Sequence, residues 1–430
     1  MESRIGDTIL QDTSDGRGRG LFLTTGKQAG DILVNELSSA IWLNKSCYNT
    51  DCAFCCLHVS DDSKPFNISC DVCKRVSYCS ISCQEYDRSQ HEFTCPFLAK
   101  SLELNLDEDA DLCVNLCVTV AYLMRNKPGE FQKIMSQDGG SSELSPEETE
   151  ACESAFRLFQ SCGADTFITK ELIFDLYKKD KACGFAIMKP PHLRLQESEQ
   201  DVDERESDNR KVSGDNNTID VKKGNATDDD EDEEEKDDGE WEDLDTESVV
   251  KGFAIYPYLS LINHSCLPNC IRWDVVDAPA DSDITAVQRR GMHFRALNAL
   301  PPGAELLHSY VPICWSLDER QEYLLDMFGF SCQCDRCITE TVIEGKHGKK
   351  STALMNLPSA DKKAYKHQYA YIQLYLEKHT CGENGCSGAL TPVVGFNESV
   401  PGSDIYECNV CLRKRSHGDF VNAVNELRRS

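Results

Sequence analysis

Cysteine spacing constrains what this chain can fold into more than any other feature of its sequence. Of its 24 cysteines, fourteen stand in short-spaced groups together with one histidine. Thiolates and imidazoles at such spacings are ligands of tetrahedral zinc, so the chain is predicted to fold around several structural metal ions. The groups read Cys52-x2-Cys55, Cys70-x2-Cys73-x5-Cys79-x3-Cys83-x7-His91-x3-Cys95, then Cys332-x-Cys334-x2-Cys337, then Cys381-x4-Cys386 and Cys408-x2-Cys411.

Residues 52–95 supply eight ligands, which is enough for two tetrahedral zinc ions. The pairs Cys79/Cys83 and His91/Cys95 are each spaced for one face of a helix. A module of about forty residues buries too little surface to fold alone, and structural zinc contributes about 10 kcal/mol or more. The alternative is a set of unrelated small core residues. That interpretation is kept for the remaining cysteines, such as Cys113, Cys117 and Cys183.

A second pattern begins with the tetrad Asn263-His264-Ser265-Cys266. Cys266 would complete a four-thiolate site with Cys332, Cys334 and Cys337, and such a closed site is structural rather than catalytic. Its bonds would bring the tetrad and the Cys-rich tail together around one pocket.

The last cysteine group, residues 381–411, suits a zinc ribbon. Gly385 within the first cysteine pair, and Gly388 and Pro392 between the two pairs, favour the turns that a ribbon needs. The alternative is a pair of loop cysteines that stay reduced.

Composition narrows the class of protein. Forty per cent of the residues are hydrophobic, as in globular proteins. No apolar run approaches the roughly 20 residues that span a bilayer, and the N-terminus lacks the apolar core of a signal peptide. We therefore expect the cytoplasm or the nucleus, where thiols hold metal rather than form disulfides.

The formal net charge of −28 is concentrated in one segment. Residues 197–247 contain 24 acidic and six basic residues, a net charge of −18, which leaves −10 for the rest. This segment contains the run Asp228–Glu235 and few apolar residues, so it is expected to be a disordered loop. The acidity of the remainder argues against a phosphate-binding surface and favours basic polypeptides as partners.

Local patterns predict the elements between the metal groups. The glycine-punctuated residues 17–37 predict two strands, and residues 108–125 have helical spacing of apolar side chains. A helix is expected to begin after Ser145, because Pro146 suits its first position and Glu148 closes a capping box. It is expected to end near residue 160, with further helices over residues 166–179, 316–328 and 359–379, and small β-sheets over 253–310.

The motifs together resemble a known family. Asn263–Cys266, the segment Gly303-Ala-Glu-Leu-Leu-His-Ser-Tyr310 and the Cys332–Cys337 run resemble the core and post-SET motifs of SET-domain lysine methyltransferases. With the cysteines of residues 52–95, they are similar to the subfamily that carries both SET and MYND domains. The resemblance also covers most of residues 1–45 and 250–340.

The resemblance implies a mainly β SET fold of small sheets, in which Cys266–Cys270 is threaded beneath another loop. A zinc finger and helices are inserted, so the whole chain is of the α+β class. The subfamily's C-terminal helical-repeat domain is expected to be missing from this short form. The implied parts are the SET N-terminal part (1–45), a MYND-type double zinc finger (46–98), a helical insertion returning to the core (99–195), the acidic loop (196–248), the catalytic core (249–330), and a post-SET zinc site, helix and ribbon-like segment (331–430).

The same resemblance implies ligands and site residues. One MYND ion would be held by Cys52, Cys55, Cys79 and Cys83, and the other by Cys70, Cys73, His91 and Cys95. One more zinc ion is expected in the post-SET site and another in the ribbon. The residues implied to bind the cofactor, S-adenosylmethionine, are Arg17, Arg19, Ser260, Asn263, His264, Tyr310 and Phe330. The implied catalytic residues are Tyr310, which would orient the lysine amine, and Tyr256, which would line the lysine channel.

The expected chemistry is a displacement at a sulfonium methyl carbon by a neutral amine, although free lysine titrates near ~10.4. An apolar channel lowers that pKa by desolvation, so the protein must chiefly supply alignment and electrostatics. A tyrosine hydroxyl suits both tasks; the alternatives are a core tyrosine for Tyr310, a core aromatic for Phe330 and a structural histidine for His264. Cys183 stands where relatives place a cofactor-contacting Asn, which predicts weaker cofactor binding.

Three functions remain open. The first is a protein-lysine N-methyltransferase that acts on a basic, lysine-containing segment of a histone or another protein. The second is a MYND adaptor that binds Pro-rich peptides and has an inactive SET core. The third, a nucleic-acid-binding zinc protein, is disfavoured by the acidic charge. We expect a monomer without direct nucleic-acid or membrane contacts, and the target lysine and the number of methyl groups stay open.

Overall fold

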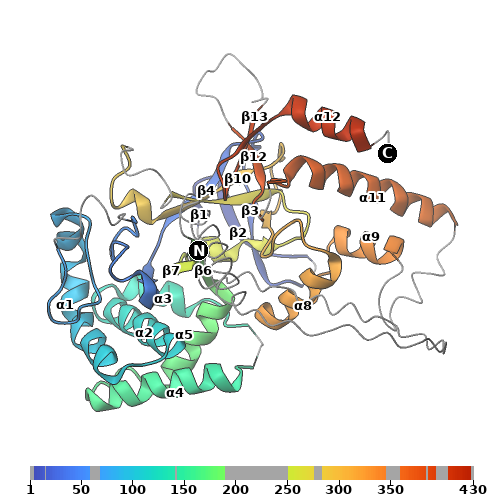
Figure 1. Cartoon of the computed structure of the whole chain (residues 1–430). Coiled ribbons are helices and arrows are strands. Elements are labelled where there is room, and N and C mark those ends of the chain that lie inside the picture. The colour runs from blue at the N-terminus through green and yellow to red at the C-terminus, as the bar shows by residue number, and fades with distance from the viewer. Residues whose placement is uncertain are drawn as a thin grey trace, which may run out of the picture.

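The computed structural model describes residues 4–14, 16–58, 68–140, 143–188, 250–275, 283–344, 359–383, 386–393 and 405–427. The acidic loop expected over residues 196–248 lies outside these ranges. Figure 1 shows short strands at the centre of the molecule, the helices of residues 81–183 on one side, and the C-terminal helices on the other.

Three small antiparallel sheets form the central β core. Two of them join strands from distant parts of the chain, and the third packs against these two, so the described parts of residues 4–43 and 250–296 fold as one unit. Leu21, Leu23 and Phe294 are buried between them. In spatial order the sheets are β1 (Arg4–Ile5), β2 (Thr8–Asp12) and β3 (Arg19–Leu23); β4 (Ile32–Leu37), β10 (Gly291–Ala296) and β9 (Cys270–Asp274); and β5 (Ala40–Leu43), β7 (Val250–Ile255) and β6 (Gly184–Met188).

A short parallel pair carries the predicted tetrad. β8 (Asn263–His264) pairs with β11 (Leu307–His308), and the chain after β8 stays bonded to the same partner. The amide of Ser265 donates to the carbonyl of His308 at 2.9 Å, and that of Asn269 donates to the carbonyl of Leu307 at 2.9 Å. The Leu297 amide donates to the carbonyl of Asn269 at 2.9 Å. The segment is therefore held between two distant parts of the chain, as the expected threading requires.

The first insertion is the cysteine-rich module, which ends in a long helix. It begins with the 3-10 turn η1 (Lys45–Cys47) and ends with α1 (Ile81–Leu104), a helix that continues well past the last predicted ligand. Ser80 caps α1 by accepting from the Cys83 amide, and Asn105 ends it in the left-handed conformation.

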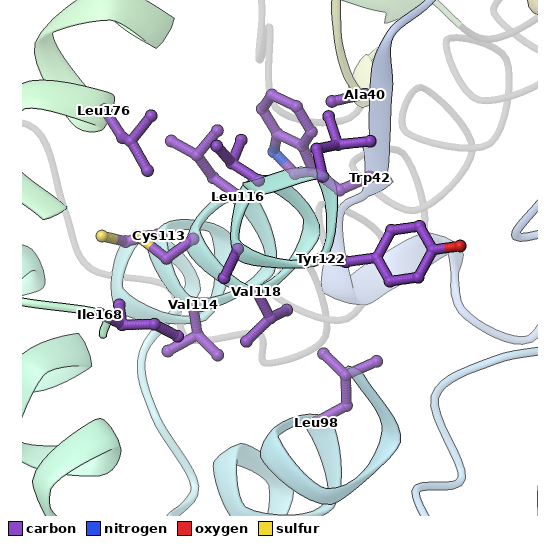
Figure 2. Close-up of a cluster of buried hydrophobic side chains, with 14 of the residues drawn as sticks. Ala40, Trp42, Leu98, Cys113, Val114, Leu116, Val118, Tyr122, Ile168 and Leu176 are labelled. Atoms are coloured by element: carbon purple, nitrogen blue, oxygen red, sulfur yellow. The ribbon is translucent and has the colours of Figure 1, made fainter. Parts of the chain in front are cut away.

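The second insertion is a helical bundle of four elements, α2 (Glu108–Asn126), α3 (Pro128–Met135), α4 (Pro146–Ser161) and α5 (Lys170–Cys183). Helix α2 lies at its centre, and Figure 2 shows side chains of other elements around it, Leu98 of α1, Ala40 and Trp42 of β5 and Leu176 of α5. A helix that is apolar around its circumference is a core helix, so α2 joins the bundle to the β core.

The helix starts in this bundle follow local capping. The predicted capping box between Ser145 and Glu148 is confirmed, with both reciprocal hydrogen bonds present. Helix α5 begins at Lys170 rather than near residue 166, because the side chain of Thr169 caps the Leu172 amide. It runs on to Cys183 and passes directly into β6.

The C-terminal part lies against the other side of the β core (Figure 1). Helix α8 (Leu317–Phe328) has the predicted capping box between Ser316 and Glu319. The ribbon is a three-stranded sheet, and Trp273 of β9 donates to the Thr391 hydroxyl within it at 3.1 Å. The remaining elements are η2 (Leu259–Leu261), η4 (Gln288–Arg290), α9 (Asp335–Glu344), α11 (Ser359–His379), β12 (Leu390–Pro392), β13 (Ile405–Cys408), β14 (Lys414–Ser416) and α12 (His417–Leu427).

Within the described part of the chain, none of the helices combines the length and the apolar character needed to cross a bilayer.

Candidate active site

Two cavities meet at Tyr310. The larger cavity, of about 830 Å³, lies between the N-terminal turn and the Cys-rich tail, and Gly16, Arg17, Asn263, His264, Tyr310, Phe330 and residues 331–335 line it. The smaller cavity, of about 400 Å³, lies between the β core and the ribbon, and its lining includes Cys183, Phe185, Ser260, Ile262, His308, Tyr310 and Phe328. Among the residues that the structure describes, Tyr310 alone lines both. Each volume lies in the range of small-molecule and cofactor sites, about 300–1,000 Å³.

Tyr310 follows β11 and is held by rings and by one hydrogen bond. Its ring centroid lies 4.8 Å from that of His308 and 4.9 Å from that of Phe328. Its hydroxyl donates to the carbonyl of Ile262 at 2.9 Å. Burial raises the pKa of Tyr310 above its usual value near 10, so the phenol stays protonated at neutral pH. Tyr310 is therefore a hydrogen-bonding group at the junction and not a base.

His264 connects Tyr310 to the cysteine cluster. Its Nδ1 accepts from the backbone amide of Tyr310 at 3.0 Å, and its Nε2 lies 3.1 Å from the Sγ of Cys266. Because Nδ1 is an acceptor, the neutral imidazole carries its proton on Nε2 and donates it to the sulfur. The side chain of His264 thus orients a metal-ligand thiolate and the backbone of Tyr310 together.

Cys266 converges with Cys332, Cys334 and Cys337, as predicted from their order in the sequence. The Sγ of Cys266 lies 3.9 Å from that of Cys332 and 3.5 Å from that of Cys337. Four thiolates at Zn–S bonds of about 2.3 Å stand about 3.8 Å apart in a tetrahedron, whereas a disulfide bond is about 2.05 Å long. The donor set therefore fits a structural zinc ion.

Two buried arginines support this cluster. The Nη2 of Arg320 lies 3.8 Å from the Sγ of Cys337, and Nη1 of Arg336 donates to the carbonyl of Cys266 at 3.2 Å. Both guanidinium groups also pair with the buried carboxylate of Glu340. A zinc ion with four thiolates carries net negative charge, which a buried cation beside the sulfurs offsets.

In the other cysteine groups, the distances between sulfur atoms also match those expected around one zinc ion. The structure brings the first eight expected ligands together in the interleaved groups that were predicted, with Cys52, Cys55, Cys79 and Cys83 in one group, and Cys70, Cys73, His91 and Cys95 in another. Their closest contacts are Cys79–Cys83 Sγ atoms at 3.5 Å and Cys70–Cys95 Sγ atoms at 3.7 Å. The fourth group brings together Cys381, Cys386, Cys408 and Cys411.

A carboxylate that sequence reasoning did not single out organises one wall beside the larger cavity. Glu305 Oε2 forms an ion pair with Nη2 of Arg17 at 2.6 Å, and its Oε1 accepts from Nδ2 of Asn263 at 2.9 Å. Gly20 makes this approach possible, because a Cβ there would lie 2.7 Å from Glu305 Oε1 and 2.9 Å from Asn263 Nδ2. The predicted Arg17 and Asn263 are thus brought together.

Phe330 also lines the larger cavity, as its predicted role requires, and its ring lies 5.8 Å from that of His264. Arg19 and Ser260 do not line this cavity. The side chain of Arg19 is exposed and donates to the carbonyl of Ser136 at 3.3 Å, while its own carbonyl accepts from Asn263. Ser260 lines the smaller cavity instead.

Tyr256, the second residue expected to be catalytic, lines neither of the two cavities, and its expected role in the lysine channel stays a prediction. Its hydroxyl donates to the carbonyl of Arg290 at 3.3 Å, on the side of β10. Its ring packs edge-on against Phe185, with centroids 5.6 Å apart, and Phe185 lines the smaller cavity in its place. Tyr256 thus supports the wall from behind.

Sequence reasoning also missed Gln137, at the end of the turn after α3. Its Nε2 donates to the carbonyl of Pro257 at 2.8 Å, and its Oε1 accepts from the hydroxyl of Ser260 at 2.5 Å. Lys179 Nζ donates to its backbone carbonyl at 2.8 Å. No local pattern marks such a residue, because its partners lie in segments that only the tertiary fold brings near.

Cys183 lines the smaller cavity at the end of α5, close to Tyr310. Its Sγ donates to the carbonyl of Asp138 at 3.3 Å. Burial raises the pKa of the Cys183 thiol to about 12, so the thiol is neutral, and its one proton is engaged in the hydrogen bond to Asp138. No described contact tests the weaker cofactor binding expected from Cys183, which stays a prediction.

The arrangement suits group transfer between two ligands. Aromatic rings of Phe185 and Phe328 wall the smaller cavity beside Tyr310. Burial lowers the pKa of His308 to about 3, so its ring is neutral there. A protonated phenol at the junction of a cofactor-sized cavity and a largely apolar one can align a neutral nucleophile with a donor held on the other side.

Comparisons with known proteins agree with this geometry. The family model described as SET domain matches residues 18–311. The chain is similar to "Histone-lysine N-methyltransferase ASHR2" of Arabidopsis thaliana, with 23% identity over 92% of both chains. It is also similar to "N-lysine methyltransferase SMYD2" of Bos taurus, at 25% identity over 76% of this chain and 59% of the relative. "Histone-lysine N-methyltransferase SMYD3" of Mus musculus is 24% identical over 76% of this chain and 61% of the relative. The chain thus spans about three fifths of these animal relatives.

Proposed function

The chain belongs to the SET-domain family, in the group that combines SET and MYND domains, and on that premise we propose that it is a protein-lysine N-methyltransferase that uses S-adenosylmethionine. The observation that carries the proposal is the place of Tyr310, the one described residue shared by a cofactor-sized cavity and a second cavity that Phe185 and Phe328 line. The names of the relatives support the reaction class.

The residues of the larger cavity fit S-adenosylmethionine, which supplies an electrophilic methyl group when bound. The guanidinium of Arg17 suits the carboxylate of the cofactor, since Arg binds carboxylates through paired donors. Asn263 and His264 line the same cavity, and Phe330 offers an aromatic face to a planar base. Glu305 holds Arg17 and Asn263 in position for this contact.

The residues of the smaller cavity fit a lysine side chain. The rings of Phe185 and Phe328 keep water away from a bound lysine, and this desolvation disfavours its ammonium form. The lysine therefore loses its proton to water, either before it enters the cavity or once it is there. The hydroxyl of Tyr310 donates its hydrogen bond to the carbonyl of Ile262, so its lone pairs are available to accept from the amine. Tyr310 thereby directs the nitrogen lone pair toward the larger cavity.

The Tyr310→Phe variant tests this proposal. Losing one positioned hydroxyl at a reaction centre should lower kcat by roughly 10²–10³-fold. The Kd for S-adenosylhomocysteine, measured by isothermal titration, and the zinc content should stay unchanged. Tyr371→Phe, on the exposed face of α11, is the matched control. Full activity of Tyr310→Phe would remove this residue from its role, and wild-type protein that binds no S-adenosylhomocysteine would overturn the proposal itself.

The cysteine-rich module supports a second role, the binding of Pro-rich peptides. Its surface exposes Val72, Ile81 and Tyr86, and the Tyr86 ring stacks on Phe54 at 5.3 Å. Exposed aromatic rings are the contact surface on which Pro-rich segments dock. Tyr86→Ala should abolish binding of a Pro-rich peptide without changing methyl transfer, and retained binding would exclude this surface.

The substrate and the setting complete the proposal. We infer a protein substrate, histone or non-histone, that presents a basic lysine-containing segment, because the chain is acidic. The cysteine groups support two zinc ions in the MYND-type finger, one in the post-SET site and one in the ribbon. Thiolate-rich sites persist in reducing compartments, which supports the cytoplasm or the nucleus. Metal analysis and fractionation test these two points.

A further inference from the structure

We propose that the C-terminal ribbon is a zinc-dependent wall of the substrate site, and that it contacts uncharged residues beside the target lysine. The ribbon comprises residues 381–393 and 405–416, of which residues 381–383, 386–393 and 405–416 are described. The inference rests on the proposed function, because it takes the smaller cavity as the place where the lysine enters.

Two turns of the ribbon reach the cavity that Tyr310 lines. Ser387, Gly388 and Ala389 line it from the first turn, and Asn409 and Val410 line it from the second. These are the turns that carry the cysteines, since Cys386 precedes the first set, while Cys408 and Cys411 enclose the second. The metal site and the cavity wall are therefore the same pieces of chain.

The ligand sulfurs directly fix the backbone of these lining residues. The Gly388 amide donates to Cys386 Sγ at 3.4 Å, and the Val410 amide donates to Cys408 Sγ at 3.3 Å. Sγ atoms of Cys386 and Cys408 lie 3.7 Å apart, close to the ~3.8 Å edge expected for two thiolates on one zinc ion. Without a metal, four thiolates would repel one another and these turns would lose their shape.

Gly388 shows how tightly the two turns meet. A Cβ at this position would lie 2.3 Å from Cys408 Sγ and 2.8 Å from Cβ of Val410. Only a glycine fits between the turns, and this close approach sets the spacing between the two sides of the wall.

The wall is also anchored to the β core. Asn409 Nδ2 donates to the carbonyl of Arg272 in β9 at 3.0 Å, and its Oδ1 accepts from the Ala389 amide at 2.8 Å. Arg272 in turn donates to the carbonyl of Ala186 in β6, which lines the same cavity. One chain of contacts thus runs from the ribbon across the core to the wall that carries Phe185, so the ribbon is a fixed part of the site.

The chemistry of the wall specifies what it accepts. Its five lining residues are uncharged, and Ala389 and Val410 present only apolar side chains. The charged residues that line the same cavity, Asp180, Lys181 and Arg272, belong to α5 and β9 and not to this wall. A charged substrate residue that faces the wall would be desolvated without a partner in it, which is costly, whereas a small or apolar residue would gain contact area. The wall therefore selects by excluding charge beside the lysine, although the chain as a whole attracts basic polypeptides.

Ser387→Trp tests the wall without touching the metal. Ser387 is exposed and lines the cavity, so a bulky ring should narrow the entrance. The matched control is Lys414→Trp, at an exposed position of β14 that does not line the cavity. Initial rates are measured with a tritiated methyl donor and two synthetic peptides, which place Ala or Glu on both sides of one lysine.

We expect wild-type protein to prefer the Ala-flanked peptide by at least tenfold in kcat/KM. Ser387→Trp should raise the peptide KM at least tenfold with unchanged zinc content and unchanged Kd for S-adenosylhomocysteine, while Lys414→Trp behaves as wild type. Cys411→Ser should lose one equivalent of zinc and show the same rise in KM. If the wild type is active but Ser387→Trp keeps its KM, or if the two peptides react equally, the ribbon inference is overturned and the proposed function stands. An inactive wild type that binds no S-adenosylhomocysteine overturns both.

Discussion

Replacing Lys251 by Met should detach the cysteine-rich module from the β core. Lys251 is in β7 and is fully buried. Its Nζ donates to the carbonyl of Cys56 at 2.8 Å and lies 3.2 Å from Oδ1 of Asp51, a carboxylate that is itself 1% exposed. Burial opposes the ionisation of Asp51, yet His58 and Lys251 hold the pKa of its carboxyl below the usual value. Met keeps the apolar stem of Lys251 and removes only its charge and its donors.

The loss follows from the burial of both groups. Removing one partner of a buried ion pair leaves an uncompensated charge and costs about 3–5 kcal/mol, well above the ~1 kcal/mol or less of an exposed pair. For a domain of this size about 1 kcal/mol shifts the Tm by about 2–4 °C, so Lys251→Met should lower the apparent Tm by at least about 6 °C. Lys414→Met, at an exposed lysine, should leave the Tm unchanged.

A double-mutant cycle in excess zinc, measured by scanning calorimetry, checks the reasoning. Asp51→Asn removes the stranded charge, so the double variant with Lys251→Met should be more stable than Lys251→Met alone. Hydrogen exchange should rise first in residues 45–58, which the pair attaches to β7. A Tm for Lys251→Met within about 2 °C of wild type, or a double variant whose losses simply add, would refute the coupling.

Three further predictions concern the cavities and their supports. Gln137→Leu should raise the peptide KM and lower stability by about 2–4 kcal/mol, because it leaves the Pro257 carbonyl without its donor and the Ser260 hydroxyl without its acceptor. Gln137→Glu keeps that acceptor and should bring the KM part of the way back to the wild-type value. An unchanged KM in Gln137→Leu would exclude a positioning role. Gly20→Val should weaken S-adenosylhomocysteine binding at least tenfold in titration with full zinc content, since a side chain there collides with the wall of the larger cavity; equal affinity would contradict this. The pKa of His308 falls from 6.5 to about 3 on folding, so between these pH values the unfolded chain binds more protons than the folded chain. The contribution of His308 to stability is therefore complete above pH 6.5 and falls by about 1.4 kcal/mol per pH unit as the pH drops toward 3. His308→Phe should move the acid-unfolding midpoint to lower pH, and the same midpoint in both proteins would refute this.

The features that the sequence predicted well are those fixed by local chemistry. A metal site imposes spacing on its ligands, so the four groups of donors were recognisable before any fold was known. A capping box needs only four consecutive residues, which is why the helix starts at Ser145 and Ser316 were predicted correctly. Tyr310 was singled out through its motif, and the structure places it in the lining of both cavities; its catalytic role stays a prediction.

The features that the sequence did not predict depend on distant contacts. The direction of Tyr256 depends on how the chain just after β7 packs against β6 and η4, and here that packing places Phe185 at the cavity and Tyr256 behind it. Gln137 stands in no recognisable motif, and the motif that contains Glu305 does not indicate its partners, because each of the two acts on residues more than forty positions away. Capping by Thr169 set the start of α5, although apolar spacing favoured an earlier residue.

If the two cavities hold donor and acceptor as proposed, the position of Tyr310 in the lining of both has a consequence for turnover. A spent donor can leave from its own compartment, and a fresh donor can replace it, while the polypeptide acceptor stays where it is. Neither molecule blocks the route of the other, so initial-rate kinetics should follow a random order of addition. The number of methyl groups added to one lysine in a single encounter is then limited by the space for the methylated nitrogen beside Phe328, and not by the exchange of the methyl donor.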